Sequence, residues 1–449
     1  MRYLPHTNTI RDEMLKSIGV NNINDLFEDI PKDYLLQSKL NLPSHKSEIE
    51  VEKILKNLAN KNVSVSNALN FIGAGAYFHH VPAAVDHLIQ RSEFLTSYTP
   101  YQPEVSQGTL QYLFEFQTQI SLLTEMEVAN ASMYDGASAC AEAILMARRI
   151  NKRKKVIYSG NLHPHYIETS KTYTKFNETN NVVLPLNLNG TADEVINYID
   201  EEASCIVVQN PDFFGNLSDF SKISEKCKKH GVLLIVVVTE VVSLGILSSP
   251  GSMGADIVVA EGQSIGNALS YGGPYLGLFA TRKKYVRQMP GRIVGQTKDI
   301  KGNRGFVLTL STREQHIRRD KATSNICTNS GLCSLAFTIH LSLLGEKGLR
   351  KLAKLNHFKA VKLFKKIQKI EGVSVINKNF FNEFTIRLPK SAENIVESLI
   401  KQNILAGVPL SRFYPDRLDL NNYLVVAVTE MVDDYQIDDF CSALKGELK

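Results

Sequence analysis

The sequence lacks the features that mark several classes of protein. Its six cysteines include no CxxC pair and no metal-ligand spacing, which is typical of reduced cysteines in a cytoplasmic protein. The longest apolar run, residues 231–247, is interrupted by Glu240 and is too short and too rich in β-branched residues to span a bilayer. The N-terminus has no apolar signal core, and its early acidic residues argue against a transit peptide. We therefore expect a soluble, cytoplasmic protein with no membrane partner.

Basic residues do not gather on one part of the chain. The net charge is only +5 over 449 residues, and the densest basic runs, residues 151–155 and 226–230, stand where helix ends or turns are expected. A dispersed charge of this size is typical of a solvated surface rather than of a nucleic-acid interface. No nucleic-acid partner is therefore expected.

Histidine and cysteine offer no convincing metal site or nucleophile. His79 precedes His80, and His163 lies near His165, but there is no HExxH motif and no carboxylate at ligand spacing. Structural histidines are the favoured interpretation, and no metal is expected. Cys140 stands inside an apolar helical pattern, which favours a position in the core.

Lysine is missing from a central stretch of the chain. None occurs between Gly231 and Arg282, although lysine is common elsewhere. Within this stretch, ADIVVAE predicts a buried strand, and the polar, Gly-rich GQSIGNALSYGG follows it as a loop. Ligands of α/β enzymes bind at the carboxyl ends of such strands. A pyridoxal-phosphate enzyme of this layout would carry its Schiff-base lysine in this loop, but no lysine is there.

From about residue 108 the sequence alternates between strand and helix patterns. Repeated βα units with continuously apolar strands predict a mostly parallel sheet covered by helices on both faces. One of the helices is expected to open with a capping box, from Thr191 to Glu194. The alternation stops near residue 310. We accordingly divide the chain into an N-terminal arm and helical layer (1–95), a large α/β domain (96–315) and a small C-terminal α+β domain (316–449).

Three polar stretches are candidates for binding. In MYDGASA a strand turns directly into a helix, so free backbone N–H groups at residues 135–138 could hold a phosphate, although plain helix capping explains the same residues. The stiff, turn-rich segment 93–111 could form a rigid binding lip, or its tyrosines could pack on the core. Segment 313–331 sets basic residues before hydroxyl and amide side chains, which suits an anion but also occurs in hinges.

Several motifs together resemble those of one family. They are RYLPHT, SEFLTSYTPYQPEVSQG, NASMYDGASA, QNPDFFG, GADIVVAEGQSIGNALSYGGPYLG and REQHIRRDKATSNICTN. Over nearly its whole length the chain is similar to the glycine decarboxylase P-protein. More narrowly, it looks like subunit 1, the N-terminal half that is a separate chain in two-subunit systems, and its length matches that half.

The resemblance implies an α/β chain with the pyridoxal-phosphate-dependent transferase type I fold, with a mostly parallel large domain and a smaller α+β C-terminal domain. It implies subunit 1 of glycine dehydrogenase (decarboxylating), an oxidoreductase of the glycine cleavage system. With subunit 2 it would decarboxylate glycine and pass the aminomethyl group to the lipoyl arm of the H-protein. Pyridoxal 5'-phosphate would be bound covalently by subunit 2, in a heterotetramer with two copies of each subunit. The isolated chain would be inactive, with no catalytic residue of its own.

The resemblance also implies roles for four groups of residues. The entrance for glycine or the lipoyl arm would be bordered by Tyr98, Tyr101, Gln102 and Glu104. The phosphate of the partner's cofactor would be contacted by Thr323, Ser324 and Asn325. A vestigial phosphate turn would consist of Asp135, Gly136, Ala137 and Ser138. The vestigial lysine loop would be marked by Gln263 and Ser264.

One segment departs from the family pattern. Glu240-Val241-Val242 stands where family members tend to have Asp-Pro-Leu, and that Asp could pair with a pyridinium nitrogen. Cofactor binding by this chain is therefore still less expected. Two other hypotheses stay open. One is a self-sufficient α/β enzyme that uses Cys140 or His165; the other is a non-catalytic scaffold or regulatory homologue of a type I pyridoxal-phosphate enzyme.

Overall fold

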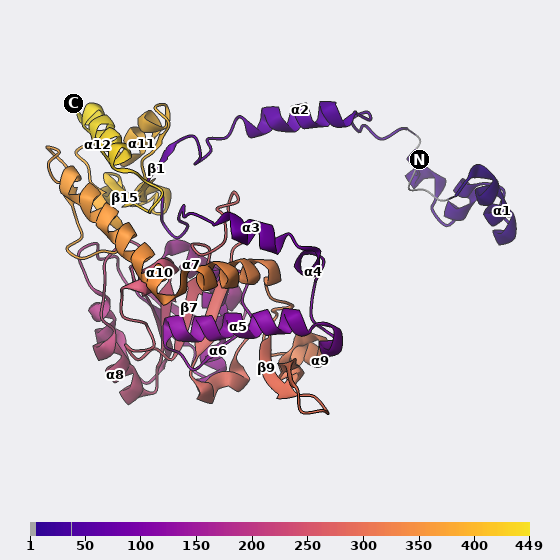
Figure 1. Ribbon diagram of the computed structural model, residues 1–449, viewed down its shortest axis with the longest axis horizontal. Helices are drawn as coiled ribbons and strands as arrows, with labels where there is room; N and C mark the ends of the chain where they lie inside the picture. Colours follow the sequence, from indigo (N-terminus) through magenta and orange to yellow (C-terminus); the bar gives the residue numbers. More distant parts are fainter. Residues whose placement is uncertain (1–5, 37) are drawn as a thin grey trace. The chain divides into compact units, whose positions relative to one another are not determined.

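The computed structural model describes residues 6–36 and 38–449 (Figure 1). The chain forms two compact units, residues 1–62 and 63–449. Residues 2–5 of the RYLPHT motif lie outside the described part. The predicted division at residues 95 and 315 stays a prediction.

The first unit contains short helices without a core of their own. Its elements are α1 (Asn8–Ile18), η1 (Ile23–Phe27), η2 (Lys32–Tyr34) and α2 (Glu48–Ala59). Capping by Thr7 begins α1, and a capping box of Ser47 with Glu50 begins α2. None of the described residues of this unit is buried, although Ile54, Leu55 and Leu58 share one side of α2.

The second unit is built on a sheet of seven strands. Their order is β2-β8-β7-β6-β5-β3-β4, and all neighbours from β7 to β4 pair in parallel, whereas β8 runs antiparallel to both β7 and β2. The predicted mostly parallel sheet is thus confirmed. The strands span Val128–Ala129 (β2), Lys155–Tyr158 (β3), Asn180–Val183 (β4), Ala203–Gln209 (β5), Leu233–Val238 (β6), Ile257–Glu261 (β7) and Gly277–Thr281 (β8).

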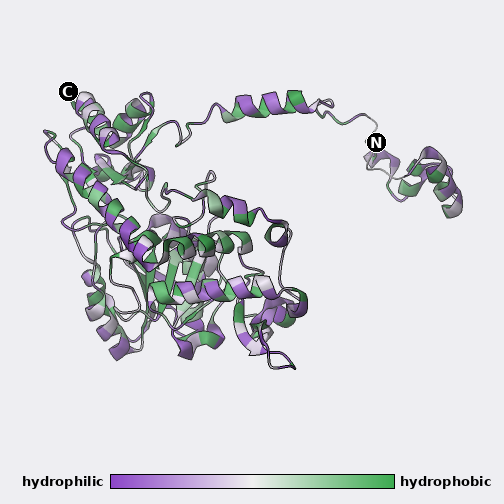
Figure 2. Ribbon diagram, viewed as in Figure 1, coloured by the Kyte–Doolittle hydropathy of each residue, from purple (hydrophilic) through white to green (hydrophobic). Residues whose placement is uncertain are grey.

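Helices cover both faces of this sheet because its strands are apolar on both. In β5, for example, Ile206 and Val208 belong to one cluster of buried side chains, and Cys205 and Val207 belong to another. The first face packs against α5 (Gln107–Thr124), α8 (Ser221–His230) and the first half of α10 (Gly331–Ile367), and the second against α6 (Gly136–Asn151) and α7 (Pro164–Thr174). Figure 1 shows α5 and α10 beside each other across the strands, and Figure 2 shows hydrophobic residues concentrated on the strands between the helices.

A second, antiparallel sheet lies in the C-terminal part of the chain. Its order is β11-β12-β15-β14, and it shares an apolar core with the second half of α10, with α11 (Ala392–Ile400) and with α12 (Asp434–Leu448). The strands span Ser374–Val375 (β11), Glu383–Arg387 (β12), Val408–Pro409 (β14) and Tyr423–Ala427 (β15). Residues near the start of the second unit join this core: β1 (Leu69–Asn70) pairs with β13 (Ile404–Leu405), and Phe71 stacks on Phe440 at 4.3 Å between ring centroids.

The remaining elements connect these layers. An antiparallel hairpin is formed by β9 (Ile293–Lys298) and β10 (Arg304–Thr309). Short helices complete the unit: α3 (Ala83–Ile89), α4 (Ser92–Leu95), η3 (Pro103–Val105), η4 (Ala192–Tyr198), η5 (Val241–Gly245), η6 (Lys283–Gln288), η7 (Ser311–Arg313), α9 (Gln315–Arg318), η8 (Arg319–Lys321), η9 (Leu410–Arg412) and η10 (Leu418–Leu420). No helix in the described part of the chain combines the length and apolarity needed to cross a membrane.

Two local features differ from the simple patterns in the sequence. The capping box expected at Thr191 is wrong: the segment is the 3₁₀ helix η4, the Thr191 side chain accepts no capping hydrogen bond, and Glu194 accepts one from Asn187 instead. The long helix α10 is interrupted at Gly345, whose φ of 58° lies in the left-handed region that glycine adopts without strain.

Candidate functional site

The carboxyl ends of β5, β6 and β7 bring together residues that are far apart in sequence. Gln209 and Glu261 end β5 and β7, and Glu240 follows the end of β6. All three side chains are buried. This edge of a parallel sheet is where α/β proteins bind their ligands. The lysine-free loop, which follows β7, therefore begins where a ligand site of this fold is expected.

The start of the predicted vestigial lysine loop, residues 262–266, is buried, whereas Ala268 and residues 270–272 are exposed. Gln263 is 1% exposed; its Oε1 accepts a hydrogen bond from the Tyr77 backbone N–H at 3.0 Å, and its Nε2 donates to the Asn267 carbonyl at 2.9 Å. Ser264 is also buried, and its hydroxyl has no hydrogen-bond partner among the described residues. The loop position at which a Schiff-base lysine would be located therefore holds the side-chain amide of Gln263.

The predicted phosphate turn does begin a helix, but two of its backbone N–H groups already donate to carboxylates. Asp135 caps α6 by accepting a hydrogen bond from the Ser138 N–H at 2.7 Å, and the Gly136 N–H donates to Oε2 of Glu261 at 3.0 Å. The expectation of free donors therefore does not hold for the N–H groups of Gly136 and Ser138. Two carboxylates already occupy the positive end of the helix. The sequence did not indicate the second one, because Glu261 belongs to β7, which is far from this turn in sequence.

Glu240 takes part in a buried ionic cluster with His79 and Glu430. The His79 imidazole bonds through Nε2 to Glu240 Oε2 at 2.9 Å and through Nδ1 to Glu430 Oε2 at 2.8 Å. Burial alone would lower the pKa of His79, but the two carboxylates overcome that effect and raise it to about 10. The same pairing lowers the pKa of Glu430 to about 2 against the effect of its burial. The cluster is therefore an imidazolium between two carboxylates at neutral pH.

Residues 71–80 lie against these strand ends. Glu383 of β12 holds this segment, since its Oε1 accepts from the Ala74 N–H at 2.6 Å and its Oε2 accepts from the Tyr77 hydroxyl at 2.8 Å. His163, before α7, lies 2.9 Å from the Ala74 carbonyl through its Nε2. The expectation that His79 and His163 are structural histidines agrees with these contacts. No group of three or more His, Cys, Asp or Glu residues in the described part is arranged to hold a metal ion.

The residues of the candidate lip are exposed on the surface of the second unit. Tyr98 is 77% and Tyr101 is 58% exposed, so neither tyrosine is buried in the core, and Gln102 and Glu104 also face outward. The Thr99 hydroxyl lies 3.3 Å from that of Thr328. The structure thus brings the lip against the predicted anion-binding segment.

The three residues assigned to the partner's phosphate face different surroundings. The Ser324 hydroxyl accepts a hydrogen bond from the Ile326 N–H at 3.1 Å and lies beside the buried Glu142, whose pKa burial raises. Thr323 is partly buried, its backbone N–H donating to the Arg313 carbonyl, and Asn325 is exposed. Asn325 is therefore the member of the three that is most open to a partner.

Sequence reasoning missed Arg292, which holds the lip and this segment together. Its guanidinium donates to the Thr328 hydroxyl at 2.8 Å and to the Cys327 carbonyl at 3.2 Å, pairs with Glu314 at 3.4 Å, and stacks 5.2 Å from the Tyr101 ring centroid. Arg292 and Glu314 are both buried. Nothing in the surrounding PGRIVG sequence indicated this role, because each partner comes from another segment.

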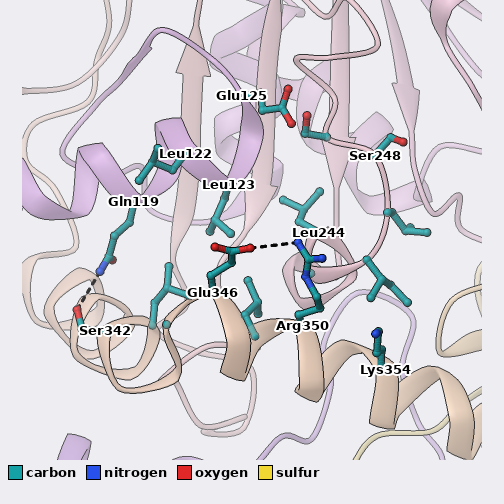
Figure 3. Close-up of a pocket in the computed structure, with 17 residues that line it drawn as sticks. Gln119, Leu122, Leu123, Glu125, Leu244, Ser248, Ser342, Glu346, Arg350 and Lys354 are labelled. Carbon is teal, nitrogen blue, oxygen red and sulfur yellow. Dashed lines mark hydrogen bonds and ion pairs between the residues drawn. The ribbon is translucent and has the colours of Figure 1, made fainter.

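A separate cavity of about 830 Å³ lies away from all these residues (Figure 3). It is bordered by the end of α5, the segment around η5 and α10 near the Gly345 kink. Figure 3 shows the Glu346–Arg350 ion pair and the Gln119–Ser342 hydrogen bond on its walls. None of the residues predicted from the sequence lines it.

The sheet, its helical layers and the buried strand ends define the type I fold of pyridoxal-phosphate-dependent enzymes. Sphingosine-1-phosphate lyase from Burkholderia pseudomallei, for example, matches 93% of this chain and 94% of its own with a TM-score of 0.66; at 15% identity this likeness shows the fold alone. The family is more specific. The model of the glycine cleavage system P-protein family matches residues 1–444, and the chain belongs to that family.

Close relatives and one solved structure agree with this assignment. A probable glycine dehydrogenase (decarboxylating) subunit 1 from Methylocella silvestris is 58% identical over 446 residues, covering 99% of this chain and 100% of that protein. Its counterpart from Beijerinckia indica is 61% identical over 434 residues, 97% of each chain. A crystal structure of glycine decarboxylase (P-protein) in an inhibitor-bound form is 41% identical, with a TM-score of 0.90, and covers 99% of this chain and 100% of that one.

The strand ends of this chain do not fit the cofactor that its fold implies. No lysine is present in the loop, since Gln263 and Ser264 stand there. The helix N-terminus that would take the phosphate is held by Glu261 and Asp135, and Glu240 is already paired with an imidazolium.

Proposed function

We propose that this chain is subunit 1 of a glycine dehydrogenase (decarboxylating) of the glycine cleavage system. The observation that carries the proposal is the match of 97–100% of its length to proteins of that name at 55–61% identity. A homologous subunit 2 provides the lysine that this chain lacks and holds pyridoxal 5'-phosphate covalently. We expect two copies of each subunit in the cytoplasmic complex.

The reaction takes place at the interface with subunit 2. Glycine loses CO2, and the aminomethyl group passes to the lipoyl arm of the H-protein. The cofactor supplies the electron sink that stabilises the carbanion left after decarboxylation. This chain contributes binding groups and the exclusion of water, and no residue of it exchanges a proton with the substrate.

Two surfaces of the chain are assigned to this interface. The lip, with Tyr98, Tyr101, Gln102 and Glu104, borders the entrance for glycine or the lipoyl arm, and its exposed tyrosines are free to contact a partner. Thr323 and Asn325 reach the phosphate of the partner's cofactor. Ser324 supports that turn from inside, because its hydroxyl is engaged with the Ile326 N–H. Arg292 fixes the two surfaces to each other.

Exchange of labelled CO2 into the carboxyl group of glycine tests the proposal. The purified chain alone is expected to show no exchange, and exchange should appear when subunit 2 and the H-protein are added. Exchange by the isolated chain would instead favour an enzyme that acts without a partner. Full exchange by subunit 2 and H-protein without this chain would favour the scaffold or regulatory alternative.

A further inference from the structure

We infer that this chain's own cofactor site is permanently closed by built-in charged groups, with the carboxylate of Glu261 taking the place of a bound phosphate at the N-terminus of α6. This closure concerns what the chain's own strand ends can bind, and it does not depend on the glycine reaction.

The surroundings of Glu261 are those of an anion site. Three backbone N–H groups converge on its carboxylate: Gly136 donates to Oε2 at 3.0 Å, and Gln263 and Leu276 donate to Oε1 at 3.1 and 3.0 Å. They come from the first turn of α6 and from both sides of the lysine-free loop. Converging N–H groups at a helix N-terminus form a ready-made site for a phosphate. Here the side chain satisfies them, and it is 4% exposed.

Asp135 strengthens the exclusion of an external anion. Its carboxylate caps the same helix by accepting from the Ser138 N–H at 2.7 Å. A phosphate placed at this turn would therefore meet the buried carboxylate of Glu261 and the partly buried carboxylate of Asp135, and like charges repel at such short range. Space is short as well, since a single Cβ added at Gly136 would come within 2.1 Å of the Tyr166 hydroxyl and 3.2 Å of the Glu261 Cβ.

The rest of the site is filled in the same way. The His79 imidazolium provides the cation that faces Glu240, at 2.9 Å. Gln263 provides a neutral amide that receives the Tyr77 N–H. The segment that carries Tyr77 and His79 packs so tightly that a Cβ at Gly73 would lie 2.2 Å from Oε1 of Glu383. The chain itself thus supplies an anion (Glu261), a cation (His79) and a neutral amide (Gln263) at these strand ends. Their contacts connect segments of the chain that are far apart in sequence.

Ligand binding to the isolated chain tests the inference. Pyridoxamine 5'-phosphate is the suitable probe because its amine cannot react with surface lysines, and inorganic phosphate is the second. Measurements are made at pH 8, since burial raises the pKa of Glu261 to about 7. The wild-type chain should show no binding of pyridoxamine 5'-phosphate up to about 1 mM in equilibrium dialysis. Phosphate should raise its melting temperature no more than sodium chloride of equal ionic strength does.

Glu261→Ala should open the site. Three N–H donors then lack a partner, and phosphate should raise the melting temperature of this variant by several degrees more than chloride does. Glu225→Ala, on the exposed side of α8, is the matched control and should behave like the wild type.

Two results would overturn the inference. One is binding of pyridoxamine 5'-phosphate by the wild type with a Kd well below about 1 mM, and the other is a folded Glu261→Ala chain that responds equally to phosphate and chloride. If Glu261→Ala does not fold, the wild-type dialysis still decides, because measurable binding contradicts closure and its absence supports it. Both measurements use the isolated chain, so they do not depend on whether the assembled enzyme exchanges CO2 with glycine.

Discussion

The Nε2 atom of His79 lies 2.9 Å from Oε2 of Glu240, and neither side chain is more than 2% exposed. The opposite ring nitrogen bonds to Glu430, which follows β15. Because Glu240 follows β6, one imidazole joins the carboxyl end of the large sheet to the C-terminal sheet. Asn356 of α10 donates to the same Glu430 oxygen at 3.0 Å and extends the cluster to the long helix.

His79→Gln is expected to lower stability and to remove an alkaline transition. The pKa of His79 is raised to about 10 in the folded chain, against about 6.5 when unfolded. The stabilisation is therefore complete below about pH 6.5 and is lost as the pH rises toward 10, at on the order of 1 kcal/mol per pH unit. Urea denaturation between pH 6 and 10 measures this dependence.

The neighbouring His80→Gln is the matched control for this prediction. His80 is exposed, and its backbone N–H, which the substitution keeps, donates to Glu430 at 2.7 Å. The control variant should retain the wild-type pH profile. A His79→Gln chain with the same alkaline loss as the wild type would show that His79 is not the titrating group.

Arg292→Ala should destabilise the chain and impair the assembled enzyme. Removing the guanidinium leaves the buried Glu314 with only the exposed His316 imidazole, 3.6 Å away, at a cost of up to about 3–5 kcal/mol, and frees Tyr101 from its cation–π contact. Arg292→Lys keeps the charge but cannot reach Thr328, Cys327 and Glu314 together, so we expect an intermediate loss. Urea denaturation of the chain and the KM for glycine in the complex measure the two effects separately.

Leu122→Ala serves as the control for Arg292, since Leu122 is 74% exposed on α5. It should change stability by less than about 0.5 kcal/mol and leave the KM unaltered. If Arg292→Lys left both the stability and the KM at wild-type values, Arg292 would not be holding the lip.

Gly73→Ala should disturb the segment that covers the strand ends. The added Cβ would lie 2.2 Å from Oε1 of Glu383, 2.6 Å from the Ala427 Cβ and 2.8 Å from Cε1 of Tyr77. Overpacking of this kind costs about 1–3 kcal/mol or more. Hydrogen exchange of the Ala74 and Tyr77 amides, which donate to Glu383 and Gln263, should become faster than in the wild type.

Gly446→Ala is the matched control, because no atom other than those of its chain neighbours and of the local α12 backbone lies within 4 Å of the Cβ it would add. A helical alanine with free space should be neutral or slightly stabilising. Unchanged amide exchange in Gly73→Ala would mean that the segment accommodates the methyl group and is less tightly packed than its contacts indicate.

The sequence allowed the sheet to be predicted because the signal for it is local. Continuous apolar strands such as ADIVVAE need helices on both faces, and the alternation with helical patterns supplies them. The missing lysine was also visible directly. The groups that fill the site were not, because His79 lies 161 residues from Glu240 and 351 from Glu430. No periodic pattern relates residues at such separations.

At the predicted phosphate turn, too, a contact between distant residues could not be predicted from the local sequence. The residues around Asp135 correctly indicated a helix start, and capping by Asp135 follows from the local sequence. Whether the remaining donors were free depended on Glu261, which reaches the turn only because α6 packs on β7. Local propensity predicted the helix, whereas tertiary packing determined what occupies its end.

The three residues assigned to the partner's phosphate should differ in how much they contribute to holding the cofactor. In the reconstituted complex, Asn325→Ala and Thr323→Ala should weaken retention of pyridoxal 5'-phosphate about 10- to 100-fold each, because a hydrogen bond to a charged group contributes about 1.5–3 kcal/mol. Ser324→Ala should have a smaller effect on retention and a larger one on stability, since its hydroxyl accepts from the Ile326 N–H inside the chain.

Cofactor absorbance during dialysis of the complex measures retention, and denaturation of the isolated variants measures stability. Thr312→Ala, at an exposed position in η7, is the control for both. The expected order of cofactor loss follows from accessibility, since Asn325 is exposed whereas Ser324 is held inward. A complex that loses its cofactor more readily with Ser324→Ala than with Asn325→Ala would reverse that order and place the serine, rather than the asparagine, at the partner's phosphate.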